Sequence, residues 1–169
     1  MATIRNATTA DLAEINEIYN DAVINTVATF DTEPKNPKEQ KAWFEKHDSR
    51  HPILVAEENG QVVGWVSLSV WSDKGAYSDT AEISLYVRKE CQGKGIGKRL
   101  LEAILKEGKK IGLHTVIARI AEGNEASIGL SKSFGFKEIG VMREVGWKFG
   151  RRLDIHMMQL IFENKSLSF

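Results

Sequence analysis

A glycine-rich segment between a predicted strand and a predicted helix constrains the fold of this chain more than any other stretch. The segment reads Gln-Gly-Lys-Gly-Ile-Gly-Lys-Arg over residues 92–99. Glycines ahead of a helix let main-chain N–H groups converge on one point, and the helix N-terminus adds roughly half a positive charge. This arrangement is typical of a site that holds a phosphate or a pyrophosphate.

Two common phosphate-binding loops do not fit the spacing of this segment. Gln92 and Arg99 occupy positions where a Walker A loop needs a glycine and a Ser or Thr. Lys98 and Leu100 occupy positions where a dinucleotide fingerprint needs its last small residue. The loop therefore indicates a different phosphate-bearing ligand.

Hydrophobic periodicity and turn residues divide the rest of the chain into helices and strands. Thr8 and Asp11 have capping-box spacing, Asn36 and Pro37 suit a helix start, and Asn59-Gly60 is a strong hairpin signal. The predicted helices cover 12–22, 37–44, 100–111 and 126–134. The predicted strands cover 53–57, 62–70, 81–87, 115–120, 136–144 and 153–162. The order predicts an α/β fold with one sheet and helices on its faces.

Composition excludes several classes of protein. The 169 residues carry 23 Lys and Arg against 23 Asp and Glu, which argues against bulk attraction to nucleic acid. The single Cys91 excludes a disulfide framework, and the four histidines show no spacing typical of a metal site. No apolar run approaches the roughly 20 residues that span a bilayer. We expect a single cytoplasmic domain over residues 1–169, with no metal, nucleic acid or membrane partner.

Two motifs together resemble a known family. Gln92-x-x-Gly95-x-Gly97 is similar to the acyl-CoA pyrophosphate loop of the GNAT N-acetyltransferase superfamily, and Asn124-x-x-Ser127-x-x-Leu130 resembles its second signature. The resemblance implies acetyl-CoA as co-substrate. It also implies the GNAT fold, a mostly antiparallel twisted sheet flanked by helices, with a splayed parallel strand pair holding the acyl-CoA.

Further segments narrow the resemblance to one branch of this superfamily. Tyr77, Ala81-Glu82 and Tyr86-Val87, with the stretch 146–151, are similar to phosphinothricin and methionine sulfoximine acetyltransferases. The similarity extends roughly over residues 4–159. It implies N-acetylation of a small amino acid or analogue, such as phosphinothricin, methionine sulfoximine, methionine sulfone or methionine, by a homodimer. A protein N-terminus or a polyamine as acceptor, and a non-catalytic acyl-CoA sensor, stay open as alternatives.

The resemblance also implies roles for particular residues. Glu82 matches the glutamate base of the family, and Ser131 stands where many members have a tyrosine general acid. Phe30, Lys74 and Tyr77 are the predicted acceptor contacts. The residues predicted to hold acetyl-CoA are Leu85, Tyr86, Val87, Gln92, Gly93, Lys94, Gly95, Ile96, Gly97, Lys98, Asn124, Ser127 and Ser133.

Overall fold

A seven-stranded mixed sheet with the order β1-β2-β3-β4-β5-β7-β6 organises the protein. The computed structural model describes residues 1–163. The strands are β1 (Thr3–Asn6), β2 (Ile53–Glu58), β3 (Gln61–Val70), β4 (Thr80–Val87), β5 (Thr115–Ala121), β6 (Lys137–Lys148) and β7 (Arg151–Ile161). The helices are α1 (Leu12–Asn25), α2 (Pro37–Glu45), α3 (Ile96–Lys110) and α4 (Glu125–Ser133), with short 3-10 turns at Thr9–Asp11, Gly75–Tyr77 and Lys89–Cys91.

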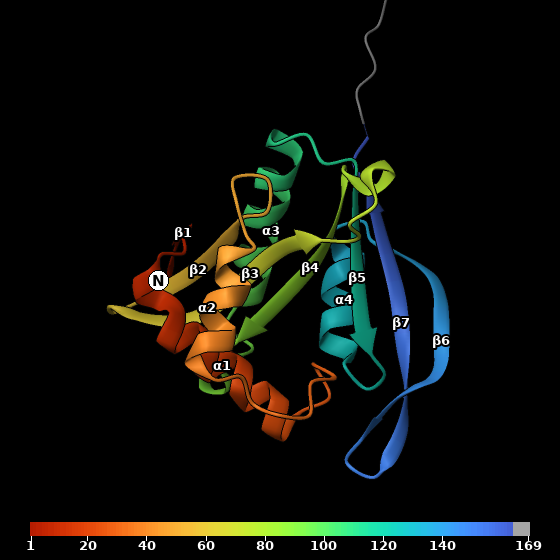
Figure 1. Ribbon diagram of the computed structural model, residues 1–169, viewed down its shortest axis with the longest axis horizontal. Helices are drawn as coiled ribbons and strands as arrows, with labels where there is room; N and C mark the ends of the chain where they lie inside the picture. The colour runs from red at the N-terminus through yellow and green to blue at the C-terminus, as the bar shows by residue number, and fades with distance from the viewer. Residues whose placement is uncertain (164–169) are drawn as a thin grey trace, which may run out of the picture.

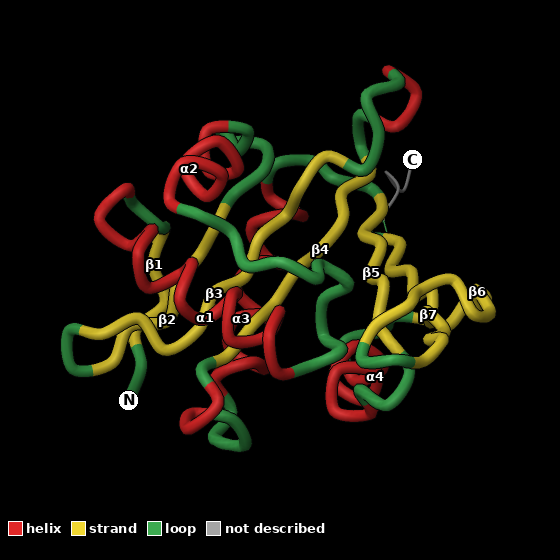
Figure 2. Tube along the Cα trace, turned by 60° about the horizontal axis from the view of Figure 1, so that its bottom comes forward, coloured by secondary structure: helices red, strands yellow, loops and turns green. Residues whose placement is uncertain are grey.

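Helices cover both faces of the sheet. Figure 1 shows α1 and α2 in front of it and α3 and α4 behind it, and the turned view of Figure 2 shows α2 and α4 on opposite sides of the sheet. The larger hydrophobic core lies under α3, where Leu100 and Ile104 pack with Val66 of β3 and Val116 of β5. A smaller core joins Ile15 of α1 to β2 and β3. Burial of these apolar faces is the main stabilising contribution to both layers.

The sheet has one parallel pair, and this pair is short. Thr80–Glu82 of β4 pair with Thr115–Ile117 of β5, whereas every other neighbouring pair is antiparallel. Beyond Glu82 the two strands separate, as Figure 1 shows, and no strand in residues 1–163 pairs with β4 on that side. The expected splayed parallel pair is therefore confirmed.

Local sequence signals predicted most elements correctly. The capping box formed by Thr8 and Asp11 is present, as is a second one at Asn36, where Pro37 opens α2. The strand β1 was not predicted, because its four residues at the sheet edge carry little apolar pattern.

The last two strands are longer than the predicted 136–144 and 153–162. They meet in a tight turn at Phe149-Gly150, where both residues have positive φ, 52° and 73°. Such a pair of angles suits a two-residue hairpin. The expected end at Glu144 is instead a bulge, since Glu144 has φ 51° and the register shifts between Met142 and Gly146.

No helix within residues 1–163 combines the length and the apolar character that crossing a membrane requires.

Asp11 anchors the start of α1 and gives a pH-dependent test of the fold. Its carboxylate accepts hydrogen bonds from the Thr8 main-chain N–H at 2.7 Å and from two guanidinium nitrogens of Arg5 at 2.8 and 2.9 Å. The Arg5 contact holds the pKa of Asp11 below its ordinary 3.8. A lowered folded-state pKa stabilises the protein above the unfolded value, and this contribution is lost as the pH falls through the folded value.

We expect Asp11→Asn to lower the free energy of unfolding at pH 7 by about 2 kcal/mol, because charge-assisted hydrogen bonds are lost. The deficit should shrink as the pH falls below 3.8, measured by urea denaturation at each pH. Asp21→Asn, an exposed position on the same helix, is the control. An equal deficit in both variants would contradict this role for Asp11.

Candidate active site

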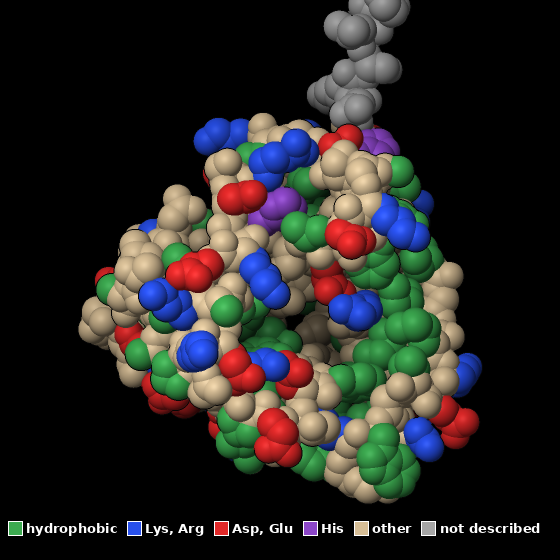
Figure 3. Space-filling view, viewed as in Figure 1, with side chains coloured by type: hydrophobic (Ala, Val, Ile, Leu, Met, Phe, Trp, Pro, Cys, Tyr) green, Lys and Arg blue, Asp and Glu red, His purple; other side chains and the backbone are tan. Residues whose placement is uncertain are grey.

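A cavity of about 890 Å³ lies where β4 and β5 separate. Its wall is formed by both strands, by α4, by α2, and by the segment 27–35 that joins α1 to α2. Figure 3 shows the corresponding hollow in the face that carries α1 and α2. Ligands of α/β sheets bind beyond the carboxyl ends of parallel strands, and this cavity has that position.

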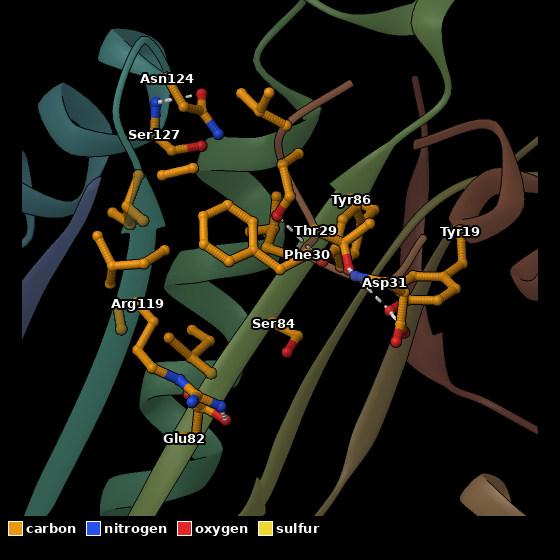
Figure 4. A pocket seen from close by; sticks show the side chains of 18 of the residues that line it. Tyr19, Thr29, Phe30, Asp31, Glu82, Ser84, Tyr86, Arg119, Asn124 and Ser127 are labelled. Carbon is orange, nitrogen blue, oxygen red and sulfur yellow. Dashed lines mark hydrogen bonds and ion pairs between the residues drawn. The ribbon is translucent and has the colours of Figure 1, made fainter. Parts of the chain in front are cut away.

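Strand β4 presents three polar side chains to the cavity. Glu82, Ser84 and Tyr86 alternate along the strand and therefore share one face, as Figure 4 shows. Burial raises the pKa of Tyr86 to about 12, so its hydroxyl is protonated at neutral pH. Glu82 is the last β4 residue in the parallel pairing and thus stands where the strands part.

Arg119 of β5 forms a two-pronged ion pair with Glu82 across this point. Its Nε and Nη2 both donate to the Glu82 carboxylate, the Nη2–Oε1 distance being 2.8 Å (Figure 4). This pairing raises the pKa of Arg119. The sequence prediction missed Arg119, although a lone arginine within the apolar run 116–121 was a visible signal. The ion pair thus places two opposite charges at the point where the strands part.

The segment 27–35 is fastened over the cavity from α1. The Tyr19 hydroxyl contacts the Asp31 carboxylate and lies 2.9 Å from the Thr29 hydroxyl (Figure 4). Burial and the contact with Asp31 raise the pKa of Tyr19. At the far end of the segment, the Asn20 side chain bonds both the N–H and the carbonyl of Lys35, at 2.8 and 2.9 Å. These contacts fix the position of the cavity wall that the segment 27–35 forms.

Strand β6 fastens the same segment from the other side. The ammonium of the buried Lys148 donates to the Thr29 carbonyl at 2.8 Å, and burial lowers the pKa of Lys148. A Cβ atom on Gly146 would lie 2.2 Å from the ring of Phe30, so only glycine lets β6 approach this closely. The bulge in β6 thereby brings Val145 to the cavity and holds the Phe30 ring within it.

The predicted acyl-CoA loop joins β4 to α3 and fits its assigned ligand. Gly93 and Gly95 have φ of 73° and 82°, which other residues adopt only under strain. The Gln92 side-chain amide donates to the Val87 carbonyl at 3.1 Å and ties the loop to β4. The unpaired edge of β4 over 83–87 supplies main-chain groups that match the amides of a pantetheine arm. Residues 92–98 would hold the diphosphate, and Lys94 and Lys98 are exposed beside it.

Helix α4 forms the opposite side of this slot. Asn124 caps the helix by accepting a hydrogen bond from the Ser127 N–H at 3.4 Å, and both residues line the cavity (Figure 4). Leu85, Tyr86, Ser127 and Ser131 all reach the cavity from β4 or α4. Ser133 does not, since its hydroxyl is exposed and donates to the Leu130 carbonyl at 2.6 Å.

The structure does not bring two of the three predicted acceptor contacts to the cavity. Phe30 lines it, whereas Lys74 and Tyr77 do not. These two residues precede β4, in and beside the 3-10 turn Gly75–Tyr77, on the far side of the paired stretch that closes the fork. The cavity is lined instead by side chains that the sequence did not assign to the acceptor, among them Tyr19, Asp31 and Trp43.

No group of three or more His, Cys, Asp or Glu side chains placed to hold a metal ion occurs among residues 1–163. Cys91 is a partly buried free cysteine that packs against the larger core.

Comparison with known proteins agrees with this geometry. The chain belongs to the acetyltransferase (GNAT) family, whose sequence model matches residues 13–136. It is 44% identical over 161 residues to an L-methionine sulfoximine/L-methionine sulfone acetyltransferase of Pseudomonas aeruginosa, covering 94% of each chain. Acetyl-CoA is the co-substrate of GNAT enzymes.

Solved structures show the same fold. A phosphinothricin acetyltransferase from Sinorhizobium meliloti, in complex with acetyl-CoA, superposes with a TM-score of 0.93 at 36% identity, covering 99% of this chain and 92% of that one. A ribosomal-protein-alanine N-acetyltransferase from Brucella melitensis superposes with a TM-score of 0.92 at 41% identity, covering 95% and 99%.

Substitution of Gly95 tests the predicted acyl-CoA loop. We expect Gly95→Val to weaken acetyl-CoA binding by at least about tenfold in titration calorimetry. Valine is strained at the φ of 82° that Gly95 adopts. The loop would shift to relieve this strain, and its main-chain N–H groups would no longer converge on the diphosphate. Gly60→Val, at φ 76° in the β2–β3 turn, introduces comparable strain away from the cavity and is the control. Equal affinity in the two variants would refute the assignment of the loop.

Proposed function

We propose that this protein transfers the acetyl group of acetyl-CoA to the α-amine of a small amino acid or amino-acid analogue. The observation that carries the proposal is the position of Glu82 at the fork of β4 and β5, where an acceptor cavity meets the slot suited to acyl-CoA. The names of the P. aeruginosa and S. meliloti relatives support methionine sulfoximine, methionine sulfone and phosphinothricin as the acceptor class.

Glu82 is the proposed general base. Acetyl transfer by direct attack needs an amine that has lost its proton and a thioester held close to it. The Glu82 carboxylate, alone or through one water, would take that proton. Main-chain N–H groups of β4 in the stretch 85–87 would then stabilise the negative charge on the acyl oxygen. Acetyl-CoA supplies the activated acyl group, and Ser131, which lines the cavity, would relay a proton to the departing thiolate.

The acceptor side of the cavity suits a side chain that is apolar or contains sulfur. Tyr19, Trp43, Trp65 and Tyr86 all line this wall, and their rings pack on one another with centroid separations of 5.0–6.2 Å. Aromatic rings make favourable contacts with sulfur groups and with the aliphatic chain of an amino acid.

A protein N-terminus is the second candidate acceptor. The name of the 41%-identical B. melitensis protein favours it, because that name specifies an alanine of a ribosomal protein. A panel of amino acids, amino-acid analogues and short Ala-initiated peptides, assayed by release of free thiol from acetyl-CoA, separates the two acceptor classes. Tight acetyl-CoA binding without turnover of any acceptor would instead indicate a non-catalytic sensor.

Glu82→Gln tests the assignment of the base. We expect a loss of kcat of about a hundredfold or more, because the amide cannot accept the amine proton, with little change in the affinity for acetyl-CoA. Glu102→Gln, an exposed glutamate on α3 that pairs with Lys106 at 2.9 Å, is the control with the same charge change. Full activity of Glu82→Gln would remove Glu82 from the mechanism.

We also propose that the enzyme is a cytoplasmic homodimer, joined through the β6–β7 hairpin. Strand β6 is the edge of the sheet and exposes large apolar side chains that a second copy could cover. These are Ile139, Met142, Val145 and Trp147, together with Phe149 of the turn that follows β6. Figure 3 shows hydrophobic side chains gathered on this side of the molecule. Since Val145 and Met142 also line the cavity, a partner there would help to shape the acceptor site.

Trp147, with 59% of its surface exposed, gives the direct test of this interface. We expect the unaltered protein to show twice its 18.9 kDa chain mass in light scattering, and Trp147→Glu to shift toward the monomer mass. A buried unpaired carboxylate would oppose association. Val70→Glu, which changes an apolar residue on β3 that is 53% exposed, is the control. A monomeric unaltered protein would refute the proposed dimer.

A further inference from the structure

Arg119 extends from β5 across the fork to the proposed base. The last β4–β5 pair joins Glu82 to Ile117, and Arg119 is the next β5 residue on the same face. Its Nε and Nη2 bind the two Glu82 oxygens, and its Cζ lies 5.8 Å from the centre of the Trp71 ring. The guanidinium is thus held between a carboxylate and an aromatic face where β4 and β5 part.

This guanidinium keeps hydrogen-bonding capacity that the protein does not use. Arginine has five N–H donors, and Nη1 of Arg119 makes no hydrogen bond with any residue in 1–163. The Arg119 side chain is 51% exposed, against 19% for that of Glu82, and both residues line the cavity. A molecule that enters the cavity therefore meets a cation and an anion side by side.

This pair of charges is complementary to an α-amino acid. An α-amino acid carries its ammonium and its carboxylate on one carbon, and guanidinium groups bind carboxylates through paired hydrogen bonds. We propose that Arg119 binds the α-carboxylate of the acceptor while Glu82 receives its amine. Arg119 is then the residue that makes the enzyme select α-amino acids. The inference rests on the proposed function and adds a residue that determines its specificity.

The same pair disfavours an amine that lacks a carboxylate. A bare ammonium approaching Glu82 would meet the positive charge of Arg119 without offering a group to bind it. Like charges brought together in this way reduce affinity for the wrong ligand. A zwitterionic acceptor offers an opposite charge to both Glu82 and Arg119. Neither side chain is then left unpaired when the acceptor displaces water from the cavity, and an unpaired buried charge is costly.

The other cations of the cavity are less suited to this role. Lys35 lies 3.5 Å from the Asp31 carboxylate, and Lys46 is exposed on α2's C-terminal side. Lys74, which the sequence suggested as the acceptor contact, does not line the cavity. Arg119 is the cation that contacts the proposed base directly.

A matched pair of acceptors tests the inference. L-Methionine sulfone and its α-amide share the amine and the side chain, but only the acid carries a carboxylate. The values of kcat/KM for both acceptors are measured in the unaltered enzyme, in Arg119→Gln and Arg119→Lys, and in Arg50→Gln. Arg50 is the control because its side chain is also 51% exposed and also pairs with an acid, Asp79, at 3.4 Å.

We expect the unaltered enzyme and Arg50→Gln to prefer the acid by at least about tenfold, the value of a charge-assisted contact. Arg119→Gln should abolish this preference, mainly by raising KM for the acid, and Arg119→Lys should restore part of it. If Arg119→Gln lowers activity on both acceptors equally, Arg119 only positions Glu82 and the inference fails while the proposed function stands. If the unaltered enzyme acetylates neither acceptor nor any other amino acid, the proposed function itself fails, and the inference with it.

Discussion

The short parallel pairing of β4 with β5 is the constraint on which the rest of the site depends. Three residues on each strand pair, ending at Glu82 and Ile117, and the strands then diverge. This single break leaves a β4 edge with free main-chain groups, opens the cavity, and places Glu82 at its apex. A longer pairing would satisfy more backbone hydrogen bonds, but it would fill the space where the acyl group and the amine must meet.

Contacts outside the fork keep it open. All of β5, Thr115–Ala121, pairs with β7, so its part beyond Ile117 is held by β7 where it no longer pairs with β4. On the other side β4 pairs with β3 from Ala81 to Val87. Behind the gap, the first turn of α3 packs against β4 and α4, since a Cβ on Gly97 would lie 3.7 Å from Leu85 and 3.6 Å from Leu130. The gap is therefore supported by packed elements on each side.

Local signals in the sequence predicted most of the fold, and non-local features account for what was missed. Caps at Asp11 and Asn36 and the apolar stripe of α3 act within a few residues, so they can be read directly from the chain. Strand β1 gains its place only by pairing with β2. Arg119 and Glu82 are 37 residues apart in the sequence, and their contact depends on the register of β4 with β5. The predicted contact Lys74 lies near Glu82 in sequence but on the closed side of the fork.

A crystal structure of the protein with acetyl-CoA tests the central claim most directly. The account predicts the pantetheine arm along the free edge of β4, the diphosphate in the turn formed by 92–98, and the thioester carbon facing Glu82. Acetyl-CoA bound elsewhere, with the gap between β4 and β5 closed or filled by protein side chains, would contradict it.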